Sequence, residues 1–133
     1  MSELFEKSTI NGLELKNRFV RSATWERMAE EDGSCTPQLV ELMGRLAEGH
    51  VGLIISGHAY IRKDGQATPQ QLGIYKDELI TSLKKMTTAV HHNGGKILAQ
   101  LAHSGAAART ASATMRAERT ATRTGRTEGT ATR

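Results

Sequence analysis

The sequence predicts an α/β protein built around a parallel β-sheet or barrel. Two apolar segments, at residues 51–56 and 96–102, have the length and composition of buried strands, and residues 18–23 are expected to form a short strand that contains polar residues. Two segments with helical apolar spacing separate them, and each helix is followed by a short connection to the next strand. This repeated order of strand and helix is typical of consecutive right-handed βαβ units, which place their strands side by side in parallel.

A small hairpin is expected before the first of these strands. Asn11-Gly12 lies between two short alternating apolar segments within residues 9–15. Asn and Gly both tolerate a positive φ, so this pair strongly favours a tight two-residue β-turn. Residues 18–23 then form the first strand of the predicted parallel sheet.

The first helix is predicted to begin at Thr36-Pro37 and to run to about Glu48. The Thr hydroxyl can accept a hydrogen bond from a free backbone N–H, and Pro at the first helical position gives up a donor that has no partner there. Gly49 is expected to end the helix in a left-handed conformation. The buried face is expected to consist of Leu39, Leu42, Met43 and Leu46.

A second helix is predicted to be capped by Asp77 and to end at Gly94-Gly95. Its expected buried face consists of Leu79, Ile80, Leu83, Met86 and Val90. The loop before it, residues 56–76, is long for a connection between a strand and a helix. Long loops that follow strand C-termini commonly carry the ligand contacts of α/β proteins, so this end of the sheet is the expected location of the site.

The last 28 residues differ from the rest in composition. Basic and acidic residues balance over residues 1–105, so the net charge of +4 comes from residues 106–133, which are rich in Ala, Thr and Arg. Met115 is the only large apolar side chain there. We therefore expect two parts, a folded body over 1–105 and a disordered tail over 106–133. A nucleic-acid-binding arm and an out-of-frame reading of the gene are the two alternatives for this tail.

Several classes of partner and site are not expected. The body has no basic stripe interleaved with aromatic residues, which disfavours a nucleic-acid surface, and no apolar run approaches the roughly 20 residues of a membrane helix. Cys35 is the only cysteine, and the N-terminus lacks a signal peptide, so a cytoplasmic location is expected. His58 and His103 lie near the expected site, whereas His91 and His92 end a helix. No pair of histidines has metal-ligand spacing with Cys or carboxylates, so no metal is predicted.

Four motifs, in order and with consistent spacing, resemble the N-terminal part of the Old Yellow Enzyme family of FMN-binding NADH:flavin oxidoreductases. They are residues 15–24 (LKNRFVRSAT), Gly33 with Thr36-Pro37, residues 45–55 (RLAEGHVGLII) and residues 95–105 (GKILAQLAHSG). The resemblance implies a TIM (β/α)8 barrel, of which this chain holds the hairpin and the first three βα units. It also implies FMN as cofactor, NAD(P)H as hydride donor, and an activated alkene or similar small molecule as substrate.

The resemblance implies FMN contacts at Ser22, Ala23, Thr24, Trp25, Gly57 and Gln100, and it assigns no catalytic residue. Gln100 offers one acceptor and two donors, which match the mixed edge of the flavin pyrimidine ring; the alternative is a Gln that bonds a neighbouring strand. Gly57 would let the backbone approach the ring closely, although an ordinary glycine between strand and loop is the alternative. The segment from Ser22 to Trp25 would line the ring, or it would simply end the first strand.

The chain departs from the family pattern at two positions. The Thr or Cys that tunes the flavin corresponds by spacing to Trp25, so either Thr24 takes that role or the contact is lost. Ala106 stands where the family commonly has Arg. Three strands are also fewer than the eight of a complete barrel, which needs about 250 residues. We therefore expect this chain alone to be inactive; the alternative is a non-catalytic remnant or an interaction protein that uses its basic tail.

Overall fold

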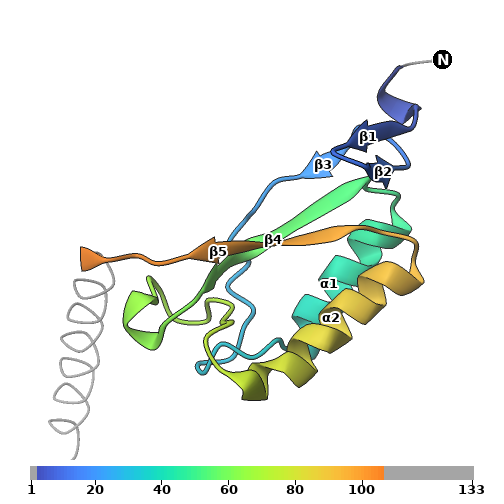
Figure 1. The fold of residues 1–133 in the computed structure, drawn as a ribbon. Coiled ribbons are helices and arrows are strands. Elements are labelled where there is room, and N and C mark those ends of the chain that lie inside the picture. The colour runs from blue at the N-terminus through green and yellow to red at the C-terminus, as the bar shows by residue number, and fades with distance from the viewer. Residues whose placement is uncertain (1–2, 107–133) are drawn as a thin grey trace, which may run out of the picture.

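A computed structural model describes residues 3–106 of the 133-residue chain (Figure 1). A two-stranded hairpin precedes a three-stranded sheet, and two helices cover one face of that sheet (Figure 1). The strands are β1 (Ser8–Ile10), β2 (Leu13–Leu15), β3 (Val20–Arg21), β4 (Leu53–Tyr60) and β5 (Ile97–Ala102), and the helices are α1 (Pro37–Glu48) and α2 (Ile80–His92). Short 3₁₀ turns occupy η1 (Glu3–Phe5), η2 (Lys63–Gly65) and η3 (Asp77–Leu79). The expected tail lies, apart from Ala106, outside the described residues.

The predicted hairpin is confirmed. Strands β1 and β2 pair antiparallel, with Ile10 opposite Leu13. The two residues between them have positive φ, 45° at Asn11 and 84° at Gly12. Both central residues of a type I′ turn need this conformation, and its twist matches that of the flanking strands.

The predicted parallel sheet is also confirmed, in the sequential order β3-β4-β5. Arg21 lies opposite Ile54, which in turn lies opposite Ile97. The predicted bounds were less accurate, because β3 has two residues instead of six and β4 continues to Tyr60. Pairing with β5 extends β4 through a stretch that contains Gly57, which local β-propensity disfavours. The loop after β4 is shorter than predicted for this reason.

A β-bulge interrupts the pairing of β4 with β5. Ile55 lies opposite Leu98 and His58 lies opposite Gln100, so β4 has one more residue than β5 between these two pairs. The extra residue shifts the alternation of side chains along β4 by one position. As a result, the side chains of β4 that follow the bulge point to the opposite face from the one they would have on a regular strand.

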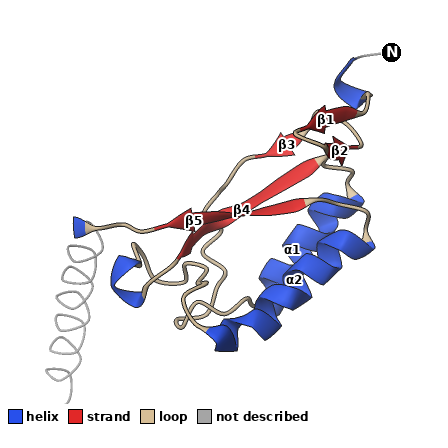
Figure 2. Ribbon diagram, viewed as in Figure 1, coloured by secondary structure: helices blue, strands red, loops and turns tan. Residues whose placement is uncertain are grey.

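The core lies between the sheet and the two helices, which cover the same face in Figure 2. It contains Leu39, Met43 and Ala47 from α1, Met86 and Val90 from α2, and Ile54, Ala59 and Leu72 from β4 and the loop after it. The expected helix faces are largely confirmed, although Leu42 and Leu46 are only partly buried. Ile80 is wrong as a core residue, since it is 50% exposed at the first position of α2.

The helix ends confirm one expected cap and correct two. The Thr36 hydroxyl accepts a hydrogen bond from the Leu39 N–H at 3.2 Å, as predicted. Gly49 has φ −70°, and the left-handed residue is instead His50, with φ 62°. Asp77 does not cap α2, because the turn η3 intervenes and Leu79 stands at the N-cap without a side-chain bond.

The second helix ends as predicted, since Gly94 adopts φ 67° just after α2. Its N–H donates to the His91 carbonyl at 2.9 Å, and the Gly95 N–H donates to Val90 at the same distance. Neither α1 nor α2, the helices of the described part, is long and apolar enough to cross a membrane.

Candidate functional site

The candidate site is the sheet face that the two helices leave uncovered, at the carboxyl end of the strands. Ile54 and Ile97 pack against the helices, so their neighbours Ile55 and Leu98 lie on the opposite face. Leu98 is 47% exposed there. The combination of an apolar surface and the strand C-termini at one place is the usual setting of a ligand site in parallel α/β proteins.

Gln100 lies on this open face, two residues after Leu98 on the same strand. Its side chain is exposed and makes no hydrogen bond with the residues that the structure describes. The amide is therefore available to a ligand, and no bond to the neighbouring strand occupies it.

His58 shares the open face with Gln100 because of the bulge in β4. The two residues lie opposite each other in the register of β4 and β5. On a regular strand His58 would face the same side as Ile54, two full repeats away, but the extra residue moves it to the side of Gln100. The sequence analysis placed His58 near the site without this reason, since a bulge is decided by strand pairing.

The segment from Ser22 to Trp25 follows β3 without regular secondary structure. Ser22, Thr24 and Trp25 are exposed, whereas Ala23 is half-buried. The Thr24 hydroxyl donates to the Ser22 carbonyl at 3.2 Å, so it bonds within the segment itself. Trp25 is 40% exposed, and the Arg27 guanidinium lies 6.0 Å from the centroid of its ring.

Gly57 lies within β4 and is buried, not past the end of the strand as the sequence analysis expected. A Cβ atom on this residue would lie 2.5 Å from the Glu26 Oε2 atom and 2.7 Å from the Thr24 carbonyl oxygen. Real Cβ contacts are not this short, so the glycine has a packing reason that involves the segment after β3. A role of Gly57 as a close flavin contact stays a prediction.

A buried ion pair joins Arg21 of β3 to Glu26, the residue that packs against Gly57. It was not predicted from the sequence. Arg21 Nη2 donates to Glu26 Oε1 in a short contact, and Arg21 Nη1 donates to the Ile55 carbonyl at 3.0 Å. The two side chains are only 16% and 9% exposed. The available signal was the charge of Arg21 within a predicted strand of the sheet, because a buried charge needs a partner of opposite sign.

The loop after β4 is held to the strand by Gln71, which is fully buried. Its Oε1 accepts from the N–H of Ala67 at 2.8 Å and of Thr68 at 3.4 Å, and its Nε2 donates to the His58 carbonyl at 3.1 Å. Nothing in the local sequence distinguished Gln71 from Gln70, which is exposed.

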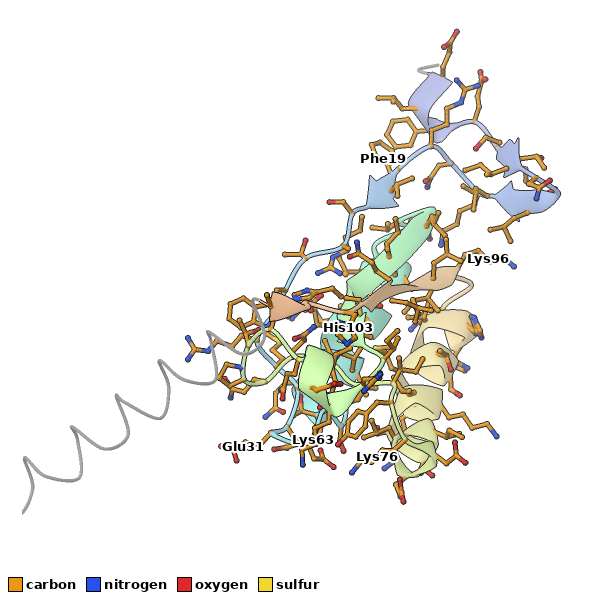
Figure 3. The ribbon with its side chains drawn as sticks, turned by 60° about the vertical axis from the view of Figure 1, so that its left-hand side comes forward. Phe19, Glu31, Lys63, Lys76, Lys96 and His103 are labelled. Carbon is orange, nitrogen blue, oxygen red and sulfur yellow. The ribbon has the colours of Figure 1, made fainter. Side chains whose placement is uncertain are left out.

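The exit of β5 is fastened to the turn η2. His103 Nε2 lies 3.8 Å from Asp64 Oδ1, and the Ser104 N–H donates to the Gly65 carbonyl at 3.0 Å. In Figure 3, His103 lies above Lys63, and Phe19 lies further toward the top of the view. Within residues 3–106, no three His, Cys, Asp or Glu side chains are grouped as metal ligands would be.

The pKa values of Asp32 and Cys35, in the segment before α1, are both shifted. Hydrogen bonds from Ser34, together with Lys76, lower the pKa of the Asp32 carboxyl from 3.8 to about 2. Burial raises the pKa of the Cys35 thiol to about 11, against a smaller opposite effect of its bond with Ser82. Cys35 is thus a protonated thiol packed against Met86, with the two sulfur atoms 4.0 Å apart.

Three solved structures resemble this fold. They are the old yellow enzyme homologue from Zymomonas mobilis (30% identity, TM-score 0.71, 77% of this chain), Old Yellow Enzyme from Pichia sp. AKU4542 (27%, 0.72, 76%) and morphinone reductase in complex with tetrahydroNAD (26%, 0.73, 80%). The match covers 28%, 26% and 29% of those chains respectively. This chain therefore spans less than a third of the length of these proteins.

The family model described as NADH:flavin oxidoreductase / NADH oxidase matches residues 3–130. The match extends past Gly105 into the segment that the sequence analysis assigned to a separate tail, so the boundary at residue 105 stays a prediction. It includes all three parallel strands, the open face with Gln100, and the segment that follows β3. By this match and by the likeness of its fold to these solved structures, the chain belongs to the NADH:flavin oxidoreductase / NADH oxidase family.

Proposed function

We propose that this chain supplies the first three βα units of an FMN-dependent oxidoreductase of the (β/α)8 barrel type. The observation that carries the proposal is the free Gln100 amide on the open face of the sheet, on the same face as the apolar side chains of Ile55 and Leu98. The proposal extends to the substrates: hydride would come from NAD(P)H and pass to an activated alkene or a similar acceptor. The complex of morphinone reductase with tetrahydroNAD supports the nicotinamide part of this proposal.

The residues on the open face fit a flavin ring. Gln100 offers one acceptor and two donors from a single amide, and the pyrimidine edge of a flavin presents a matching mixed set. Leu98 and Ile55 supply an apolar surface on the same face, which suits a flat aromatic ring. Ser22 to Trp25 would approach the ring from the end of β3, which pairs with β4. When bound, FMN would supply the hydride chemistry, while these residues bind and orient it.

The described residues include candidate contacts for the flavin ring of FMN, but no candidate contacts for its phosphate group. Neither α1 nor α2, the helices of residues 3–106, begins with a glycine-rich loop that could cradle a phosphate group. Charge-assisted hydrogen bonds to such a group contribute roughly 1.5–3 kcal/mol each. We therefore propose that FMN binds weakly to residues 1–105 alone, and that later strands of a complete barrel supply the phosphate contacts.

A chimera tests the proposed function. Residues 1–105 would be joined in register to the later barrel strands of the Zymomonas mobilis homologue, and flavin absorbance would be measured after purification with FMN. We expect stoichiometric FMN in the chimera and little in the 133-residue chain. In the chimera, Gln100→Ala is expected to weaken FMN binding by about tenfold, the equivalent of one hydrogen-bonded amide.

Each arm has an outcome that contradicts the proposal. A folded chimera without flavin would refute FMN binding by this face. Stoichiometric flavin in the 133-residue chain would refute the expected dependence on later strands. Unchanged FMN affinity in the Gln100→Ala chimera would show that Gln100 is structural, and Gln38→Ala, on the exposed surface of α1, serves as the matched control.

A further inference from the structure

The strands β3 and β4 separate directly after Arg21. Their pairing consists of Val20 with Leu53 and Arg21 with Ile54. The next β4 carbonyl, that of Ile55, accepts a hydrogen bond from the Arg21 guanidinium at 3.0 Å. The side chain thus continues the connection between the strands for one more residue, at the place where the backbone of β3 leaves the sheet.

The same guanidinium holds Glu26, five residues along the chain. Both side chains are largely buried, at 16% and 9% exposure, so neither charge is compensated by water. Glu26 is also placed from its other side, because its Oε2 atom occupies the space where Gly57 lacks a side chain. Ser22 to Trp25 form the short loop that this ion pair closes.

Few other hydrogen bonds hold that loop, although the Thr24 carbonyl packs against Gly57 of β4. The Thr24 hydroxyl bonds only to the Ser22 carbonyl, inside the loop. The next hydrogen bond with the rest of the protein comes after Glu26, where Arg27 Nε donates to Gln70 Oε1 at 3.1 Å. The path of residues 22–25 therefore depends on the ion pair at one end, on β3 at the other, and on the packing of the Thr24 carbonyl against Gly57 between them.

We propose that Arg21 and Glu26 are positioning residues that fix the segment Ser22–Trp25 at the carboxyl end of the sheet, and that Gly57 is required because Glu26 occupies its space. The importance of this segment for flavin rests on the proposed function. The effect of the ion pair on the segment itself does not, and it can be measured without flavin.

Trp25 makes that measurement possible, since it is the only tryptophan of the chain and lies inside the loop. The test is quenching of its fluorescence by acrylamide in the full 133-residue chain. Glu26→Gln removes the charge with little change of shape, and Arg21→Met removes the donor. Trp25 is 40% exposed, so its release is expected to raise the quenching constant about twofold in both variants, with far-UV circular dichroism unchanged.

Three further variants separate positioning from a general loss of structure. Arg21→Lys keeps the charge and is expected to restore quenching most of the way to the original value. Gly57→Ala, which displaces Glu26 from the other side, is expected to give the same rise as Glu26→Gln; if it fails to fold, Glu26→Gln decides alone. Glu14→Gln is the matched control, because Glu14 pairs with Lys7 in the exposed hairpin, where both side chains are about 70% exposed.

Unchanged quenching in Glu26→Gln and Arg21→Met would overturn the proposal, as would an equal rise in the Glu14→Gln control. The link to flavin is tested in the chimera, where Glu26→Gln is expected to weaken FMN binding about tenfold. If quenching rises but FMN affinity does not change, the segment is not a flavin contact and that part of the proposal is wrong. A chimera that binds no FMN refutes the proposed function, whereas the quenching result stands on its own.

Discussion

Gln71 is the residue whose replacement gives the sharpest test of how the loop is attached to β4. Its side chain is fully buried and makes three hydrogen bonds, all to backbone groups. Gln71→Leu keeps the size of the side chain but removes every bond. The N–H groups of Ala67 and Thr68 and the carbonyl of His58 would then lose their partner.

The expected cost follows from these three groups. A neutral hydrogen bond contributes about 1 kcal/mol net, and each buried group left without a partner costs about 1–3 kcal/mol. The Thr68 bond is long, at 3.4 Å, and the Leu side chain gains from burial in place of an amide. We therefore expect the free energy of unfolding to fall by about 3 kcal/mol. His58, beside Gln100, would be the first site residue affected.

Urea denaturation of the full chain, followed by circular dichroism, measures this change. With a slope near 1.5 kcal/mol per molar urea, the midpoint is expected to fall by about 2 M. Gln38→Leu is the matched control: the side chain is exposed on α1, and the change is expected to stay within about 0.5 kcal/mol. A Gln71→Leu variant as stable as the control would refute the reasoning that these bonds hold the loop.

Three further predictions concern residues outside the loop. Asn17→Ala is expected to lower the free energy of unfolding by about 2 kcal/mol, since Asn17 is 6% exposed and its Nδ2 donates to the His50 carbonyl at 2.6 Å; an unchanged urea midpoint would contradict this. The pKa of Asp32 is lowered from 3.8 to about 2, mainly by Ser34, so its contribution to stability is present above about pH 4 and lost as the pH falls toward 2. Asp32→Asn should therefore flatten the decline of the urea midpoint over that range, and an identical decline would argue against the assignment. Cys35, with its pKa raised to about 11, is expected to react with a thiol reagent at pH 8 about 100-fold more slowly in the folded than in the urea-unfolded chain, and similar rates would show an accessible thiolate.

Local chemistry accounts for the elements that the sequence predicted correctly. Asn11-Gly12 has one strongly favoured turn, and Thr36-Pro37 begins a helix for reasons that lie within a few residues of the chain. The apolar positions of α1 and α2 recur with the helical period, which is a local signal of a buried helix face. Both helices were therefore predicted close to their observed positions. The parallel order of three strands followed from the alternation of these elements.

Features that depend on a neighbouring strand or segment were placed wrongly or not at all. The end of β4 was predicted four residues too early. The last residues of β4 are in a strand conformation because they pair with β5. The left-handed turn after α1 is at His50 and not at Gly49, where the Asn17 side chain binds the His50 carbonyl from far along the chain. Gly57 was interpreted as a place where the backbone could approach a ring closely, and the packing of Glu26 and the Thr24 carbonyl against it was not foreseen.

The sequence by itself therefore determined the type and order of the elements, the hairpin turn, and the family to which the chain belongs. The tertiary structure alone decided which side chains share the open face and how the segment after β3 is held. The bulge that brings His58 to Gln100, and the ion pair of Arg21 with Glu26, depend on contacts between segments distant in sequence or on the exact point where two strands part. Such contacts produce no periodic pattern in the local sequence. The partner of a charged residue or of a glycine therefore cannot be identified from the sequence alone.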